Sequence, residues 1–469
     1  MTKVAFHNLG CKVNAYEMEY MQQMFTKCGY EIVPFAEKAD IYIVNTCTVT
    51  NIADRKSRQM LHRAKKMNPE SIVVATGCYV QTDTEDAKQD ESIDLLVGNN
   101  RKKEIVSIVE EFIEKKKLSA DEKSGKDIQN AQSVPDMALE TEYEEFRLEQ
   151  TGEHTRAYIK IQDGCNQFCS YCIIPYARGR VRSRKAEDVL TEIRGLAEHG
   201  YQEVVLTGIH LSSYGLDFHK NADEETVSYN GAAAAGGFTS TDLISLIEQV
   251  EQIEGIRRIR LGSLEPRIIT EEFLERLAVL TKFCPHFHLS LQSGSDTVLK
   301  RMNRQYSAGE YYEKTELIRR YFEHPALTTD VIVGFPKETE EEFEETRAYL
   351  EKVNFYEVHV FKYSRRHGTA ADRMSGQLTE KEKAVRSSLL IEEAAKRSRQ
   401  YREWYLNRPL EVLFEETQEI EGAVYQVGYT KEYVKAAAVG QADLNNRIVP
   451  GTALGMLTDE ILVFSSNLE

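Results

Sequence analysis

The 469-residue sequence predicts an α/β protein with three parts: an N-terminal doubly wound parallel sheet, a central partial (β/α)6 barrel and a small C-terminal β-barrel. Strand and helix patterns alternate over residues 1–115, and the same alternation repeats six times after residue 156. Short strand patterns then fill roughly the last 60 residues. A chain of this length exceeds one hydrophobic core, so about two to four domains are expected.

The N-terminal sheet is predicted from short apolar, β-branched segments that are each followed by a helix pattern. Strands are expected at 3–8, 40–45, 71–76 and 93–97, and helices near 14–27, 52–66 and 102–115. This alternation favours parallel strands. Residues 116–150 are polar and strongly charged, which predicts a linker or a loosely packed connection after the first domain.

The central domain, residues 151–385, is predicted from six strand–helix units. The expected strands are 157–161, 203–207, 256–261, 287–291, 328–333 and 357–363, with helices near 186–199, 241–253, 271–281, 308–322 and 339–352. Six units suit an open, partial barrel, in which chemistry is located at the carboxyl ends of the strands. Residues 216–240 interrupt the rhythm with a polar insertion, which is expected to be a flexible surface loop.

The last domain, residues 386–469, combines a connecting helix with short strands. The helix is expected at 380–406 and the strands at 410–414, 423–429, 433–437 and 461–464, which favours a barrel of the oligonucleotide-binding type. Residues 401–469 hold five Lys or Arg against eleven Asp or Glu, so their charge alone does not indicate RNA binding. A base-stacking face is still expected from Tyr425, Tyr429, Lys431, Tyr433 and Lys435.

The composition limits where the protein works. An apolar content of 41% and a charged content of 29% are typical of a soluble globular protein. No apolar run reaches the length of a membrane span, and the first residues have a strand pattern rather than a signal peptide, so a cytoplasmic location is expected. The net charge of −16 argues against broad, nonspecific binding to nucleic acid but allows a local basic track.

Three of the eight cysteines form one tight motif, Cys165-x3-Cys169-x2-Cys172. Three thiolates from one loop leave a bound metal centre with an open position, whereas structural zinc usually has four ligands. The spacing therefore favours a [4Fe–4S] cluster with one free iron over zinc. Cys28 and Cys284 fit no ligand pattern and are expected to be packing residues.

Cys11, Cys47 and Cys78 each lie just past the end of a predicted strand. Because the carboxyl ends of parallel strands share one edge of a sheet, the three thiols are expected to converge there. Gly10 and Gly77 would allow close approach of the backbone. A second cluster with three protein ligands is the preferred interpretation, and three buried structural cysteines are the alternative.

The residues around the tight motif resemble a known family. Residues 165–172, with Ile-Gln-Asp-Gly before them and Ile-Ile-Pro-Tyr-Ala-Arg-Gly-Arg after them, are similar to the radical SAM methylthiotransferases. The resemblance spans nearly the whole chain, with a three-cysteine N-terminal domain, a radical SAM barrel and a C-terminal TRAM domain. Residues 9–17, Leu-Gly-Cys-Lys-Val-Asn-Ala-Tyr-Glu, resemble the branch that modifies N6-threonylcarbamoyladenosine in tRNA.

This resemblance implies two [4Fe–4S] clusters and two uses of S-adenosylmethionine (SAM). The cluster on Cys165, Cys169 and Cys172 would cleave SAM to a 5′-deoxyadenosyl radical, which abstracts the hydrogen at C2 of the adenine. The auxiliary cluster on the other three cysteines would carry a methylated sulfur and deliver a methylthio group. The implied partners are the tRNA substrate and a reductant such as flavodoxin or ferredoxin, with no membrane partner.

Two further groups of residues are implied as contacts. Residues at strand ends are expected to touch SAM, namely Thr207, Gly208, Ser263, Glu265 and Gln292. A basic run directly after the cluster loop is expected to bind RNA phosphates or to neutralise SAM and the cluster, namely Arg178, Arg180, Arg182, Arg184 and Lys185. Lys337, where the family often has glycine, and the 216–240 insertion depart from the family pattern.

Other functions remain open from the sequence. The substrate could instead be isopentenyladenosine in tRNA or an aspartate of a ribosomal protein. From another class, the chain could be a non-catalytic iron–sulfur electron carrier that binds RNA, and structural zinc in both cysteine sets would give a colourless protein. Formation of 5′-deoxyadenosine separates the enzyme from the electron carrier.

Overall fold

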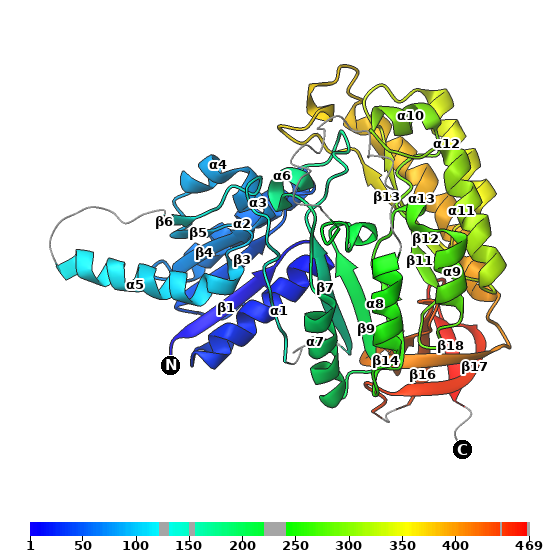
Figure 1. Ribbon diagram of the computed structural model, residues 1–469, viewed down its shortest axis with the longest axis horizontal. Coiled ribbons are helices and arrows are strands. Elements are labelled where there is room, and N and C mark those ends of the chain that lie inside the picture. The colour runs from blue at the N-terminus through cyan, green and yellow to red at the C-terminus, as the bar shows by residue number, and fades with distance from the viewer. Residues whose placement is uncertain (122–130, 150–154, 220–240, 441–442, 467–469) are drawn as a thin grey trace.

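The computed structural model describes residues 1–121, 131–149, 155–219, 241–440 and 443–466, and it confirms the three-part α/β architecture (Figure 1). The N-terminal sheet lies on one side of the central barrel, and the C-terminal barrel lies against the barrel's lower end in this view. Most of the expected loop at 216–240 falls outside the described residues.

The N-terminal domain is an all-parallel sheet of six strands in the order β2-β1-β3-β4-β5-β6. The strands are β1 Lys3–Asn8, β2 Glu31–Val33, β3 Ile41–Thr46, β4 Ile72–Gly77, β5 Leu95–Val97 and β6 Ala131–Ser133. Helices α1 Lys12–Lys27 and α5 Ile105–Asp121 pack on one face, and α2 Asn51–Met67, α3 Cys78–Thr82 and α4 Thr84–Lys88 pack on the other. Apolar strand residues alternate between these two cores, so the sheet is doubly wound as predicted.

The segment expected to be a loose connection is, in its described part, packed against the domains. Helix α5 extends beyond the predicted end, β6 pairs with β5, and Phe146 and Leu148 are buried against Tyr16 and Tyr20 of α1. A few apolar residues in a charged stretch show no periodicity, which is why the sequence did not reveal this packing. Strand β2 is too short to give a pattern and was also not predicted.

The central domain is the predicted partial barrel. Its six parallel strands are β7 Arg156–Asp163, β9 Glu203–Gly208, β10 Arg258–Leu261, β11 His286–His288, β12 Ala326–Val333 and β13 Glu357–Lys362. Parallel bridges between Ile259 and Phe283 and between Leu264 and Leu289 join the two halves, β10-β9-β7-β8 and β11-β12-β13. Strand β8 Arg182–Ser183 is antiparallel to β7.

Helices cover the outside of this barrel and bury one large apolar core. They are α7 Ala186–Glu198, α8 Thr241–Glu251, α9 Glu271–Ala278, α11 Ala308–Tyr321 and α12 Glu340–Val353. Two shorter helices, α6 Ile174–Arg178 and α10 Asp296–Arg301, follow the carboxyl ends of β7 and β11.

Helix α13 Glu380–Glu403 leads to a closed five-stranded barrel in the order β14-β15-β16-β18-β17. Its strands are β14 Pro409–Ile420, β15 Ala423–Tyr429, β16 Lys435–Val439, β17 Ile448–Met456 and β18 Leu462–Ser466. Strand β17 was not predicted, because Pro450, Gly451 and Gly455 interrupt its pattern. Within the described part of the chain, no helix is both long and apolar enough to span a membrane.

The C-terminal barrel is docked on the amino ends of the central strands. Arg258 donates hydrogen bonds to the carbonyls of Tyr429 and Glu411, each at 2.9 Å. Arg260 donates to the carbonyls of Lys431 at 2.9 Å and Thr430 at 3.3 Å. The small barrel therefore covers the end of the central barrel opposite the expected chemistry.

The expected base-stacking face is wrong for Tyr429 and Tyr433, because these rings face the docking interface. They stack on each other with centroids 4.7 Å apart, and Tyr433 stacks on His286 at 5.2 Å. The guanidinium of Arg156, on β7, lies over both rings, 5.0 Å from the centroid of Tyr429 and 4.9 Å from that of Tyr433. The sequence alone does not show whether closely spaced aromatic residues face solvent or another domain.

Candidate active site between two cysteine sets

The first cysteine set consists of Cys11, Cys47 and Cys78, and it forms at one edge of the N-terminal sheet. Strand β3 pairs with both β1 and β4, so the residues after these three strands are neighbours. Cys47 and Cys78 follow Thr46 and Gly77, which lie opposite each other in register. Burial and the nearby thiols of Cys78 and Cys11 raise the pKa of Cys47 to about 12, so the three sulfurs are close enough to interact. The strand register thus brings the three cysteines to one edge of the sheet.

Two glycines make this approach possible. Gly10 has φ +112°, and a Cβ there would lie 3.1 Å from the sulfur of Cys47. Gly77 has φ +98°, and a Cβ there would lie 2.5 Å from the carbonyl oxygen of Thr46. Both positions require glycine, because φ is positive and a side chain would collide with a neighbouring atom. The backbone therefore forms a cradle around the first cysteine set, as the sequence indicated.

The second set, Cys165, Cys169 and Cys172, lies in the loop after β7. Its backbone is closed by hydrogen bonds from Cys165 N to Gly179 O at 3.0 Å and from Cys172 N to Cys169 O at 2.9 Å. Burial and the Cys169 thiol raise the pKa of Cys172 to about 12. These sulfurs also interact with one another, as three ligands of a single cluster must.

Arg304 is the charged partner of the second set. Its Nη1 donates a hydrogen bond to the sulfur of Cys169 at 3.3 Å, and its Nη2 donates to the carbonyl of Ser290 at 3.2 Å. A buried guanidinium favours the thiolate form, which is the form that binds metal. This role could not be predicted, because Arg304 follows α10 and is distant in the chain from the loop.

A buried ion network connects the two sets through α1. Glu17 accepts from Lys102, from Arg178 and, at 2.8 Å, from Lys160. Burial acts to raise the pKa of Glu17, but Arg178 and the two lysines hold it well below its usual range. Asp163 lies 2.6 Å from Lys160 and is the other anion of the network. This Glu17 network crosses from the N-terminal sheet to the central barrel.

The charge of the Glu17 network fits an anionic cofactor beside it. Lys102, Lys160 and Arg178 outnumber the two carboxylates of Glu17 and Asp163, and all five groups are buried. Arg178 is also close enough to Cys78 for that thiol to raise the pKa of the guanidinium. A surplus of buried cations is costly unless a further anion compensates it. Three thiolates with an iron–sulfur cube provide such an anion.

A second junction fixes the first cysteine set from the opposite side. Arg366, in the loop after β13, is buried and donates to the hydroxyl of Thr48 and to the carboxylate of Asp54. Asn99 donates from Nδ2 to Ala177 O at 2.8 Å, and the same nitrogen lies 3.8 Å from the sulfur of Cys78. Figure 1 shows α3, which begins at Cys78, beside α6 of the central domain. The segments that carry the two cysteine sets therefore meet where the domains join.

Among the described residues, the sulfurs of the two cysteine sets are spaced more widely than the ligands of one zinc ion. One tetrahedral zinc with Zn–S bonds of about 2.3 Å holds its sulfurs about 3.8 Å apart. Among the described residues, the one group of three possible ligand atoms within 4.8 Å of one another is His288, Asp330 and His359. The three sulfurs of neither cysteine set all lie within this distance of one another.

Three arginines of the basic run do not lie where RNA could reach them. Arg178, Arg182 and Arg184 are each about 1% exposed. Arg182 donates to the carbonyls of Arg178 and Arg180, and Arg184 pairs with the buried Glu192. The expectation of phosphate contacts is therefore wrong for these three residues.

The remaining two residues of the run have other surroundings. Lys185 is exposed, and Arg180 lies half-buried over the ring of Phe168, 4.4 Å from its centroid.

The expected SAM residues lie at the carboxyl ends of the strands, as predicted. Thr207 is buried, and Gly208 lies against Gln162, whose Oε1 would be 2.9 Å from an added Cβ. Ser263 is exposed on the loop after β10. Gln292 has φ +73° and donates from its backbone to Asp330 O at 2.8 Å.

Glu265 is tied to the second cysteine loop by Arg267. The Nε of Arg267 donates to Glu265 at 2.8 Å, and its Nη2 donates to Gln167 Oε1 at 3.2 Å. Next to them, His210 donates from its backbone to Gln162 Oε1 at 2.7 Å, and burial, Arg304 and Arg267 lower its pKa to about 3. A neutral imidazole therefore lines this side of the loop, a feature that the sequence did not reveal.

A six-stranded partial barrel with a three-cysteine loop after its first strand defines a radical SAM enzyme. Residues 159–350 match the Radical SAM superfamily, and residues 3–98 match the Uncharacterized protein family UPF0004. The structure of the radical S-adenosylmethionine methyltransferase TsrM from Kitasatospora setae, with cobalamin and a [4Fe-4S] cluster bound, has a similar fold. Its TM-score is 0.53 at 14% identity, over 79% of this chain and 77% of that chain.

Curated relatives identify the family more closely. The chain is 39% identical to "Threonylcarbamoyladenosine tRNA methylthiotransferase MtaB" of Bacillus subtilis (strain 168), over 96% of this chain and 93% of the relative. It is 32% identical to "tRNA-2-methylthio-N(6)-dimethylallyladenosine synthase" of Pelotomaculum thermopropionicum (strain DSM 13744 / JCM 10971 / SI), over 97% and 96%. The chain belongs to the radical SAM methylthiotransferase family, whose cofactors are SAM and [4Fe–4S] clusters.

Proposed function

We propose that this protein adds a methylthio group to C2 of N6-threonylcarbamoyladenosine in tRNA. The observation that carries the reaction is the pair of cysteine sets joined by the Glu17 network. The choice of nucleoside is supported by the greater identity to the threonylcarbamoyladenosine relative, 39% against 32% for the dimethylallyladenosine relative. The segment 9–17 supports the same choice.

Each cysteine set has its own role in this proposal. Cys165, Cys169 and Cys172 hold the cluster that binds SAM, and Cys11, Cys47 and Cys78 hold the auxiliary cluster. When bound, SAM and the two [4Fe–4S] clusters supply the reductive cleavage and the sulfur that the transfer requires.

Neighbouring side chains position these groups. Arg304 stabilises the Cys169 thiolate, and Phe335, which lies edge-on to Tyr171 with centroids 6.5 Å apart, excludes water from the loop. Thr207, Gly208, Ser263, Glu265 and Gln292 orient SAM at the strand ends. The ion pair of Arg178 and Glu17 joins the two domains that carry the cysteine sets.

The partners follow from the same proposal. Exposed Lys185 and the half-buried Arg180 contact the tRNA backbone, and the C-terminal barrel acts as a TRAM domain that assists RNA binding. A reductant such as flavodoxin or ferredoxin supplies the electron for SAM cleavage. The protein works in the cytoplasm, where its tRNA substrate is found.

The test is the nucleoside content of tRNA from a deletion strain. Mass spectrometry should show loss of 2-methylthio-threonylcarbamoyladenosine, with unchanged 2-methylthio-isopentenyladenosine. The wild-type gene and a Cys28→Ala variant should restore the product, because Cys28 is exposed and outside both sets, whereas Cys47→Ala should not. Unchanged threonylcarbamoyladenosine thiolation in the deletion strain would reject the proposal.

A further inference from the structure

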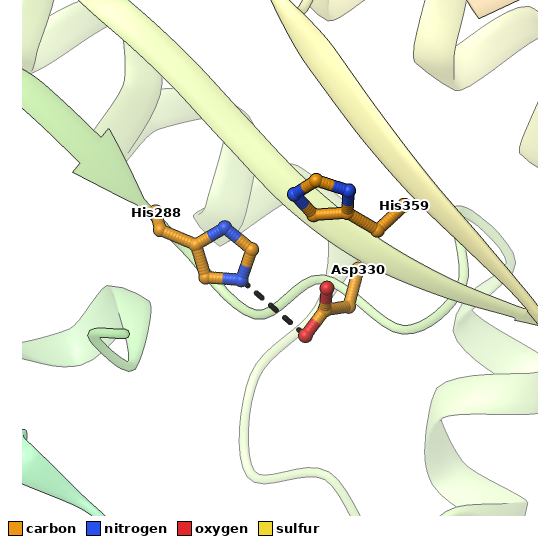
Figure 2. A group of neighbouring side chains, drawn as sticks. All are labelled: His288, Asp330 and His359. Carbon is orange, nitrogen blue, oxygen red and sulfur yellow. Dashed lines mark ion pairs between the residues drawn. The ribbon is translucent and has the colours of Figure 1, made fainter. Parts of the chain in front are cut away.

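A group of three possible metal ligands lies on the inner wall of the central barrel, apart from both cysteine sets. His288 ends β11, Asp330 lies on β12 and His359 lies on β13. Asp330 and His359 are partners in the β12–β13 register, and β12 is also the partner of β11. Val331 and Val358, of the opposite strand parity, pack in the core under the helices, so the three polar side chains point into the barrel. Figure 2 shows them converging.

The spacing of these groups fits a bound ion. The three possible ligand atoms lie within 4.8 Å of one another, and the Nε2 of His288 is 3.3 Å from Oδ2 of Asp330. A charge-assisted hydrogen bond is shorter, about 2.7–2.9 Å. Two ligands of a tetrahedral metal with bonds of about 2.0–2.1 Å are about 3.3 Å apart. The separation of His288 and Asp330 is therefore compatible with two ligands on one metal.

The other ring nitrogen of His288 is held in the way that metal-binding histidines usually are. Nδ1 of His288 lies 2.9 Å from the hydroxyl of Thr328, which is buried. That hydroxyl lies 3.3 Å from Nε2 of His286, also buried. Such outer partners fix the ring and direct the remaining nitrogen at the metal. The arrangement leaves Nε2 directed at Asp330.

The chemistry of the three side chains selects the ligand. Two imidazoles and one carboxylate suit zinc, iron(II), manganese and related divalent ions. Without a metal ion, a substrate carboxylate at this place would be repelled by the carboxylate of Asp330. The side chains of His288 and Asp330 are 13% and 29% exposed and His359 is exposed, so the set is open to the barrel interior. Catalytic metal sites often have three protein ligands and one open position that a substrate atom can fill, and this triad has the same composition.

The triad lies beside the loop after β11, in which Gln292 is proposed to contact SAM. The backbone of Gln292 donates to Asp330 O, and Ile332 N donates to Gln292 O, each bond being 2.8–2.9 Å. Two residues before Gln292, the Ser290 carbonyl accepts from Arg304, which contacts Cys169. A metal on the triad would therefore face the cavity in which the reaction is proposed to occur.

We propose that His288, Asp330 and His359 bind one divalent transition-metal ion, and that its open position takes a carboxylate oxygen of the substrate. The second half rests on the proposed function: a threonylcarbamoyl group carries a free carboxylate, whereas an isopentenyl group has none. The metal would thus help the enzyme to distinguish the two nucleosides, because only one of them offers a ligand.

The metal is tested on the full chain with both clusters assembled. Protein is dialysed anaerobically against zinc, desalted, and analysed for zinc, iron and sulfide. Wild type should retain about one zinc per chain. His288→Ala, Asp330→Asn and His359→Ala should retain almost none, at unchanged iron and sulfide. Thr328→Val should weaken zinc binding about 10- to 100-fold.

His62→Ala is the matched control, because His62 pairs with Asp90 at 2.9 Å on the surface and is outside the triad. It should retain zinc like wild type. His359 is exposed, so its variant is expected to fold, and circular dichroism checks this. Equal zinc in wild type and in the triad variants would overturn the site.

The role in recognition is tested by binding of anticodon stem-loops that carry either nucleoside. Zinc should tighten binding of the threonylcarbamoyladenosine stem-loop at least several-fold, should not affect the isopentenyladenosine stem-loop, and should have no effect in His359→Ala. Zinc retained without this difference overturns the carboxylate role and leaves the metal site standing. Failure of the proposed function is a separate result: no methylthiolated product from the threonylcarbamoyladenosine stem-loop, at any zinc level.

Discussion

The two cysteine sets are built in opposite ways. Cys165, Cys169 and Cys172 lie within eight residues, and local backbone hydrogen bonds shape their loop. Cys11, Cys47 and Cys78 lie tens of residues apart and meet because three strands are in register. The local set depends on one loop, whereas the dispersed set depends on the folding of a whole domain. A change in the N-terminal sheet should therefore damage one set and spare the other.

The largest expected effects come from removing one ligand from each set. Cys169→Ala should abolish formation of 5′-deoxyadenosine, because two thiolates hold the cluster poorly. Cys47→Ala should leave 5′-deoxyadenosine formation measurable but eliminate the methylthiolated nucleoside. Both products are quantified by mass spectrometry after anaerobic reconstitution. Equal loss of both activities in both variants would mean that the sets are one mixed site.

The next effect concerns the Glu17 network that joins the two sets. Glu17→Gln should lower the free energy of unfolding by about 3–5 kcal/mol, because it leaves Lys102, Lys160 and Arg178 buried without their shared anion. Denaturant unfolding measures this change. We expect methylthiolation to fall more than SAM cleavage, since the second set has its own loop.

The control for this variant is Glu111→Gln, which removes the exposed pair with Lys115. Its stability should change little, because solvent screens such pairs. A Glu17→Gln protein as stable as this control would contradict the role of the network.

A smaller effect tests the cradle of the dispersed set. Gly77→Ala should destabilise the N-terminal domain by at least about 2 kcal/mol, because φ is +98° and the new Cβ meets Thr46 O at 2.5 Å. After reconstitution, iron should fall from about eight to about four atoms per chain, since only the local set still assembles.

Gly29→Ala separates strain from crowding. Gly29 has φ +84° but nothing within 4 Å of an added Cβ, so the cost should be about 1 kcal/mol and iron should be unchanged. Equal iron loss in the two variants would show that backbone strain, rather than the cradle, controls assembly.

The last effect is a change in the slope of stability against pH, and it provides a reference outside both sets. Burial raises the pKa of Glu203, but Arg260 at 2.9 Å and Arg156 hold it below the usual value. Between this lowered pKa and the ordinary value of 4.5, the unfolded chain binds more protons, so stability falls as the pH falls through that range. Thermal unfolding from pH 6 to pH 3 should show a flatter pH dependence for Glu203→Gln than for wild type. Parallel pH curves would contradict this assignment.

Local patterns revealed much of this molecule. The strands that carry the dispersed cysteines are apolar and buried, so their ends, and with them the candidate ligands Cys11, Cys47 and Cys78, could be located. Lys337, where the family often has glycine, has φ +65°, so even this departure marks a left-handed position. The surroundings of the basic run could not be predicted, because such a run looks the same in a sequence whether it faces solvent or buried carboxylates. The partners of Arg178 and Arg184 include Glu17 and Tyr16, which lie far away in the chain.

The docking of the C-terminal barrel has an evolutionary consequence. Arg258 and Arg260 bind mainly peptide carbonyls of that barrel, which every amino acid provides. Substitutions on its outer surface can therefore accumulate without loosening the attachment. The sequence of that surface can diverge while the position of the barrel on the central domain stays the same.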